Sequence, residues 1–228
     1  MGVFFQKHPV AIHPRLLPVA ENNGVFYVLF GLLLLIAIIR FYQPAFAKVV
    51  FSWFPGTGSR KNNPGGKQGL FLPSFLLLNF IVSTTLFLMV LQMKTGAAPS
   101  DILSSPHFWF YATGGVVGFF LYVQVSALLT GFVFDTGHQA FLQMKNNLLW
   151  AYISGLFLTL LLLIYFYSGA VIIMDGIIGL WLILLLFKWF KTAETGLSTR
   201  NFNVLHLFLY LCAVEIAPLF LLIKIYLM

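Results

Sequence analysis

Long apolar runs separated by short polar segments dominate the pattern of this 228-residue chain. A helix of about 20 residues crosses the ~30 Å hydrocarbon core of a bilayer. The candidate spans are residues 25–42, 70–91, 108–129, 148–167, 170–190 and 204–227. Helices are expected because a segment in lipid must satisfy its own backbone polar groups. The pattern therefore predicts an all-α fold, a polytopic transmembrane helical bundle of about six spans.

The segments outside these runs differ in kind. Residues 1–24 contain prolines and no apolar signal core, so we expect an irregular tail before a membrane domain of residues 25–228. Residues 43–69 are rich in Gly, Pro and Lys and predict a basic loop. Residues 131–147 mix apolar and polar positions and are expected to lie in the membrane interface. The fifth span begins either at residue 170 or at Asp175.

Composition supports a membrane protein. Hydrophobic residues make up 60% of the chain and charged residues 8%, against about 25% charged in a soluble domain. The lipid bilayer is therefore the expected partner. The net charge of +7 lies in loops and at helix ends, where positive-inside bias explains it without nucleic acid.

Orientation follows from the basic residues. Nine of the 13 Lys and Arg residues fall on one side of the predicted spans, which we expect to be cytoplasmic. Six spans then place both termini outside the cytoplasm, in a multi-pass protein of the bacterial inner membrane.

Glu215 lies near the middle of the last apolar run. A carboxylate at that depth costs roughly 3 kcal/mol, so it should have a partner or a role. Pro218 leaves the carbonyl of Val214 without its helical donor and predicts a kink. Glu215 either holds helices together by hydrogen bonds, which we favour, or titrates as a proton or ion site. Its candidate partners are Asn79, Gln124, Tyr210, Ser83, Thr84 and Thr85.

A second polar group is expected on the cytoplasmic side. Asp135 and His138 have the i, i+3 spacing of one helix face, and Arg200 and His206 belong to the same side. These residues predict either a metal or anion site or, as we favour, a solvated interfacial cluster. A lipid-modifying enzyme would need Asp135, His138 and His206 to converge. We expect no bound metal, no cofactor and no catalytic activity.

Small and aromatic residues also stand out. Gly114-x-x-x-Gly118 predicts close helix approach, for which we favour a contact within the chain over one with a partner. Trp150 lies near a predicted span end, as an interfacial tryptophan does. Trp181 lies mid-span and is expected to pack against another helix. Cys212 is the single cysteine, which excludes a disulfide within the chain.

The C-terminal segment carries a family resemblance. Residues 203–224 read NVLHLFLYLCAVEIAPLFLLIK, and their most specific part is the Leu-Tyr-Leu-Cys-x-x-Glu-x-x-Pro core. With the Asn-Asn-Gly entry to the first span, this resembles a domain-of-unknown-function family of polytopic inner-membrane proteins from Bacteroidota. The resemblance implies the same membrane fold and draws attention to Tyr210, Glu215 and Pro218. It implies no activity.

These observations favour a non-catalytic accessory or scaffold subunit of a membrane assembly, one that serves envelope biogenesis or secretion, with other membrane proteins as partners. The alternative is a small transporter or channel that uses Glu215 as its proton- or ion-coupling carboxylate.

Overall fold

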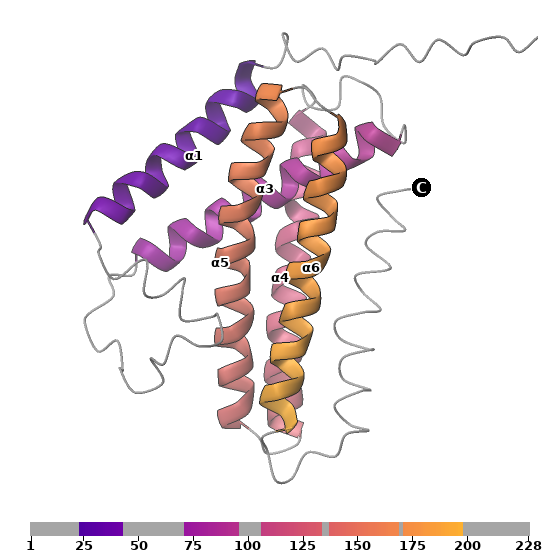
Figure 1. The fold of residues 1–228 in the computed structure, drawn as a ribbon. Helices are drawn as coiled ribbons and strands as arrows, with labels where there is room; N and C mark the ends of the chain where they lie inside the picture. The colour runs from indigo at the N-terminus through magenta and orange to yellow at the C-terminus, as the bar shows by residue number, and fades with distance from the viewer. Residues whose placement is uncertain (1–22, 43–70, 96–105, 134–136, 169–170, 198–228) are drawn as a thin grey trace, which may run out of the picture.

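The computed structural model describes residues 23–42, 71–95, 106–133, 137–168 and 171–197 as helices (Figure 1). They are α1 (Asn23–Tyr42), α3 (Phe71–Thr95), α4 (Pro106–Val133), α5 (Gly137–Ser168) and α6 (Val171–Leu197). Helices α3 to α6 are long and apolar enough to cross a membrane, and α1 has a shorter apolar stretch, Gly24–Ile38. The all-α bundle is confirmed. The tail before residue 23, the basic loop and the sixth predicted span lie outside the described residues.

Helices α4 and α5 extend beyond the predicted spans. We expected residues 131–147 to lie in the interface, but α4 continues to Val133 and α5 already begins at Gly137. Residues 138–147 contain no proline and several good helix formers, so nothing interrupts the helix. Their place in the interface stays a prediction. With 32 residues, α5 is about 48 Å long, more than the ~30 Å hydrocarbon core. Helix α6 begins at Val171, so Asp175 lies inside its first turns.

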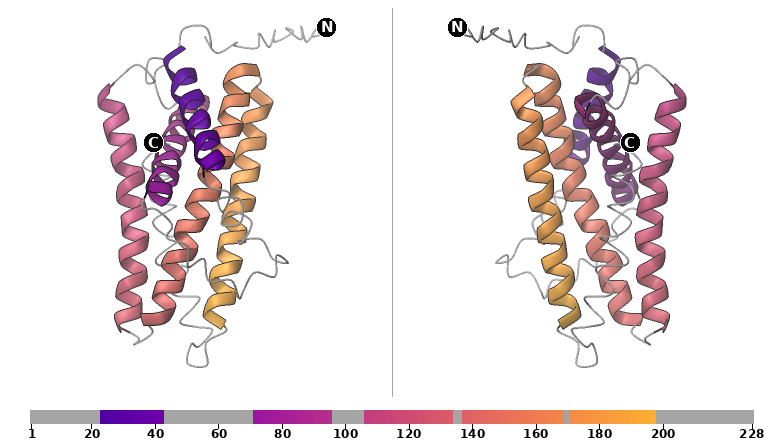
Figure 2. Two further views of the ribbon diagram at one scale, coloured as in Figure 1. Left: turned by 90° about the vertical axis from the view of Figure 1, so that its left-hand side faces the viewer. Right: turned by 90° about the vertical axis from the view of Figure 1, so that its right-hand side faces the viewer.

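Helix α5 is the centre of the bundle, because it contacts each of the other four described helices. Helices α4, α5 and α6 run roughly alongside one another, whereas α1 and α3 cross them obliquely (Figure 1). Within their apolar windows α3 and α5 are each 56% buried, while α4 is 28% and α6 is 22% buried. Figure 2 shows α4 at one edge of the bundle. Helices α4 and α6 therefore present most of their surface outward.

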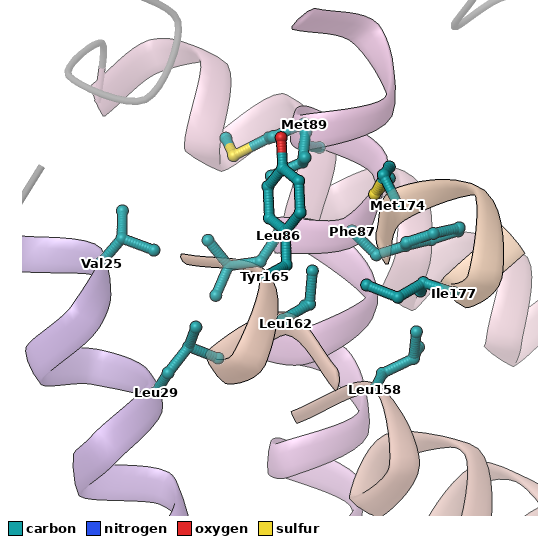
Figure 3. Packing of buried hydrophobic residues seen from close by; sticks show 12 residues of the cluster. Val25, Leu29, Leu86, Phe87, Met89, Leu158, Leu162, Tyr165, Met174 and Ile177 are labelled. Atoms are coloured by element: carbon teal, nitrogen blue, oxygen red, sulfur yellow. The ribbon is translucent and has the colours of Figure 1, made fainter. Parts of the chain in front are cut away.

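The largest apolar cluster joins all five described helices, and α4 contributes Ala112 to it (Figure 3). Leu29 of α1, Leu86 of α3, Leu162 of α5 and Ile177 of α6 are each fully buried in it. In lipid, burial from water does not drive such packing, since the surrounding acyl chains are equally apolar. Dispersion between well-fitted side chains and polar contacts between helices must hold this part of the bundle together.

An ion pair joins one end of the bundle. The Lys94 ammonium at the end of α3 donates to the Asp175 carboxylate in the first turns of α6. The pair places these two helix ends on the same side, as alternating spans require. Both groups are at least partly exposed, so we expect the pair to add little to stability.

Candidate functional site

Two buried polar residues, Asn79 and Thr159, meet where α3 crosses α5. Gly155 of α5 faces the backbone of Phe80 in α3, and a Cβ atom built on Gly155 would lie 2.7 Å from the Phe80 Cα. Real Cβ atoms do not come that close to backbone atoms. Glycine is therefore required here for the two helices to approach each other, as small residues permit between membrane helices.

One side-chain hydrogen bond spans this crossing. The Thr159 hydroxyl donates to Asn79 Oδ1 at 2.8 Å, and both residues are buried. The same hydroxyl also lies 2.9 Å from the carbonyl of Gly155, one turn earlier in α5. Among the described residues, Asn79 Nδ2 has no hydrogen-bond partner. Asn79, predicted as a partner of Glu215, thus binds Thr159 through its oxygen.

The neighbouring hydroxyls are mostly satisfied within their own helices. Ser83 donates to the Phe80 carbonyl at 3.2 Å, and Thr85 donates to the Ile81 carbonyl at 2.8 Å. Such bonds to the preceding turn satisfy a hydroxyl without a second helix. Thr84 differs, because its buried hydroxyl has no partner in the part of the chain that the structure describes.

The other members of the predicted site do not come together in the described helices. Gln124 of α4 is buried, and neither of its amide atoms has a partner among the described residues. No hydrogen bond links it to Asn79. Glu215, Pro218 and Tyr210 lie outside the described residues, so their predicted roles stay predictions.

Of the polar cluster predicted on the cytoplasmic side, only His138 lies within the described residues. His138 is exposed in the first turn of α5, and Asp135, Arg200 and His206 lie outside the described residues. Within residues 23–42, 71–95, 106–133, 137–168 and 171–197, no three His, Cys, Asp or Glu side chains are grouped so that they could hold a metal ion. The convergence that a lipid-modifying enzyme needs stays untested.

An aromatic groove lies beside the crossing. It is lined by α3, α4, α6 and the Trp150 ring of α5, and encloses about 190 Å³. Trp150 packs against Phe80 with ring centroids 5.8 Å apart and donates its indole N–H to the Leu184 carbonyl at 3.2 Å. The buried Lys188 ammonium lies 5.2 Å from the centroid of the Trp150 ring. A cation over a desolvated indole face is stabilised by about 2 kcal/mol.

Two expectations about tryptophan can now be compared with this groove. Trp181 packs against Phe87 of α3 with ring centroids 5.8 Å apart, so its predicted contact with another helix is confirmed. Trp150 is buried and lies about 20 Å from the start of α5. Its predicted place near a span end stays a prediction.

The Gly114 and Gly118 face of α4 has no close contact among the described helices. We favoured a contact within the chain, yet both glycines are exposed, and no described residue would come within 4 Å of a Cβ atom on either. The close contact is instead at Gly155, which the sequence analysis did not single out. An isolated glycine inside an apolar helical run is the signal that could have identified it.

The crossing residues can position helices, and the groove can accept an apolar group beside a cation. Comparison with curated proteins and with solved structures finds no match for this chain. A family profile described as a domain of unknown function, DUF4271, matches residues 25–226, which include every described helix apart from the first two residues of α1. The chain therefore belongs to the DUF4271 family, and its described part is a helical bundle with several helices fit to cross a membrane.

Proposed function

We infer that this protein is a non-catalytic accessory or scaffold subunit of a membrane assembly in the bacterial inner membrane, one that serves envelope biogenesis or secretion. The supporting observation is the exposed glycine face of α4, formed by Gly114 and Gly118, over which the described helices place nothing within 4 Å of a Cβ position. Small residues at this spacing let a second helix approach its backbone closely. A transmembrane helix of a partner protein fits this face.

The weak burial of α4 agrees with this role. Only 28% of its apolar window is buried inside the bundle, half the share of α3 or α5. Lipid can cover such a surface, but a lipid chain gains nothing particular from a row of glycines. A partner helix does gain, because closer backbones increase van der Waals contact.

The test is purification of the tagged full-length chain in mild detergent, with identification of the membrane proteins that accompany it. Gly114→Ile and Gly118→Ile should remove a specific companion while the yield of the tagged chain is unchanged. Gly31→Ile in α1 is the matched control, because Gly31 is also exposed with open space around it. Purification of the wild-type chain alone and monomeric, or equal loss in all three variants, would contradict the subunit role.

A carrier or channel would depend on Glu215 instead. If the protein is a subunit, Glu215→Gln should have almost no effect on abundance or growth, since an amide keeps most hydrogen bonds. Glu215→Leu should lower the abundance of the protein. A proton-coupled carrier predicts that Glu215→Gln abolishes transport with abundance intact. Measuring abundance and the growth or secretion defect of both variants separates the two functions.

A further inference from the structure

The aromatic groove is lined mostly by apolar side chains, and one cationic side chain, Lys188, lies at one end of it. Along α6 its lining runs from Ile178 to Trp189, which is about 16 Å at 1.5 Å per residue. Lys188 belongs to the end of this stretch nearer the C-terminus of α6. Leu182, 48% exposed, also lines the groove, so its rim opens on the outer surface of the bundle, where acyl chains lie.

Two further polar groups line the groove between the cation and the apolar end. The Trp181 indole N–H and the Thr84 hydroxyl are buried and have no hydrogen-bond partner among the described residues. An indole N–H can only donate, and a hydroxyl can also donate. Buried donors of this kind are costly unless satisfied, so the groove calls for an occupant that carries an acceptor oxygen.

The volume limits the occupant. A cavity of about 150 Å³ lined by apolar side chains holds one benzene molecule, and this groove encloses about 190 Å³. By this measure a segment of one hydrocarbon chain fits such a space, whereas a complete two-chain lipid does not. The bilayer supplies such chains at high concentration, and basic pockets between membrane helices bind anionic lipid headgroups.

We propose that the groove between α4 and α6 binds a segment of one acyl chain of an anionic phospholipid, with the phosphate at Lys188. An ester oxygen of the lipid accepts a hydrogen bond from Trp181 or Thr84, and the chain continues past Phe87 and Ile178. This site lies apart from the glycine face of α4 and does not depend on the proposed subunit role.

Tryptophan fluorescence can report this binding directly. Three of the five tryptophans line the groove, and Trp53→Phe with Trp109→Phe removes the other two. The full-length chain with these two changes is placed in phosphatidylcholine nanodiscs containing a set fraction of dibrominated phosphatidylglycerol or dibrominated phosphatidylcholine. Bromine quenches nearby indoles, and we expect phosphatidylglycerol to occupy the quenching site about fivefold more readily.

Charge and shape variants separate this site from general lipid contact. Lys188→Gln should remove the preference for phosphatidylglycerol, and Lys188→Arg should keep it. Lys191→Gln is the matched control, because Lys191 lies one turn further along α6, pairs with Glu194 and does not line the groove. Should Lys188→Gln fail to fold, Thr84→Leu, which fills the groove with Lys188 intact, should abolish the preference instead.

Three results would overturn the proposal. The first is equal quenching by both brominated lipids in the starting protein. The second is an equal loss of preference in Lys188→Gln and Lys191→Gln. The third is Lys188-dependent quenching by a dibrominated free fatty acid but not by phosphatidylglycerol, which would identify a single-chain carboxylate as the occupant.

Discussion

Gly155 is the residue on which the approach of α3 to α5 depends. Its absent side chain leaves room for the Phe80 backbone, which cannot move aside as a flexible side chain can. An added Cβ atom would meet nothing within 4 Å at seven other glycines, which are Gly24, Gly31, Gly114, Gly118, Gly137, Gly176 and Gly179. Close backbone approach is therefore concentrated at one place in the described bundle.

Gly155→Ala should destabilise the protein. Overpacking costs about 1–3 kcal/mol, which exceeds the ~1 kcal/mol that alanine gains over glycine inside a helix. The measurement is the unfolding free energy of the purified chain in mixed micelles titrated with a denaturing detergent. Gly179→Ala in α6, which has open space around it, serves as the control and should be neutral or stabilising. Equal stability of the two variants would show that α3 and α5 can separate without cost.

At the scale of elements, the contact between α3 and α5 also depends on a polar bond. Thr159→Val keeps the shape of the side chain but removes the donor to Asn79 Oδ1. Hydrogen bonds between membrane helices contribute about 0.6 kcal/mol on average and up to about 1.7. We expect Thr159→Val to lower the unfolding free energy by an amount in that range, nearer its upper end, because the buried Asn79 Oδ1 then loses its hydrogen-bond donor.

A matched variant isolates the contribution between helices. The Thr130 hydroxyl donates to the carbonyls of Ser126 and Ala127 in its own helix, so Thr130→Val removes a hydroxyl without removing a contact between helices. Thr159→Val should lower the unfolding free energy more than Thr130→Val. In a double-mutant cycle, Thr159→Val should cost less once Asn79→Leu is present. Additive losses would mean that the Asn79–Thr159 bond contributes no coupling.

The sequence predicted which stretches form helices better than where those helices end. Apolar runs mark the part of a helix that lies in hydrocarbon, and the four central runs each correspond to a long helix. They do not mark the polar turns beyond it. Lys145 and Asn146 lie just before the predicted apolar run, and both are compatible with the helix that α5 forms there.

The polar site was less predictable for a related reason. Asn79 was identified because an amide is unusual at that depth, but its partner Thr159 is a common residue in apolar helices and gave no distinct signal. The groove was missed altogether. It depends on Trp150 of α5 and Lys188 of α6 meeting in space, and a helical pattern gives the face of each residue without the rotation of one helix relative to the next.

At the scale of the whole molecule, the ion pair between Lys94 and Asp175 fixes which helix ends share a side. The end of α3 and the start of α6 lie together, and the end of α4 and the start of α5 lie one membrane-length helix away from them. From the positive-inside rule we expect the end of α4 and the start of α5 to face the cytoplasm.

Cysteine labelling in cells can test that orientation. His138 near the start of α5 and Ile172 near the start of α6 are both exposed and lie about one helix length apart. Cys212→Ser removes the single native thiol. In that background, Ile172→Cys should react with a membrane-impermeant maleimide in intact spheroplasts, whereas His138→Cys should react only after lysis. The lysine and arginine excess is the physical reason, because basic segments are retained on the cytoplasmic side. Reversed labelling would overturn the orientation, and labelling of both sites from one side would overturn the crossing by α5 itself.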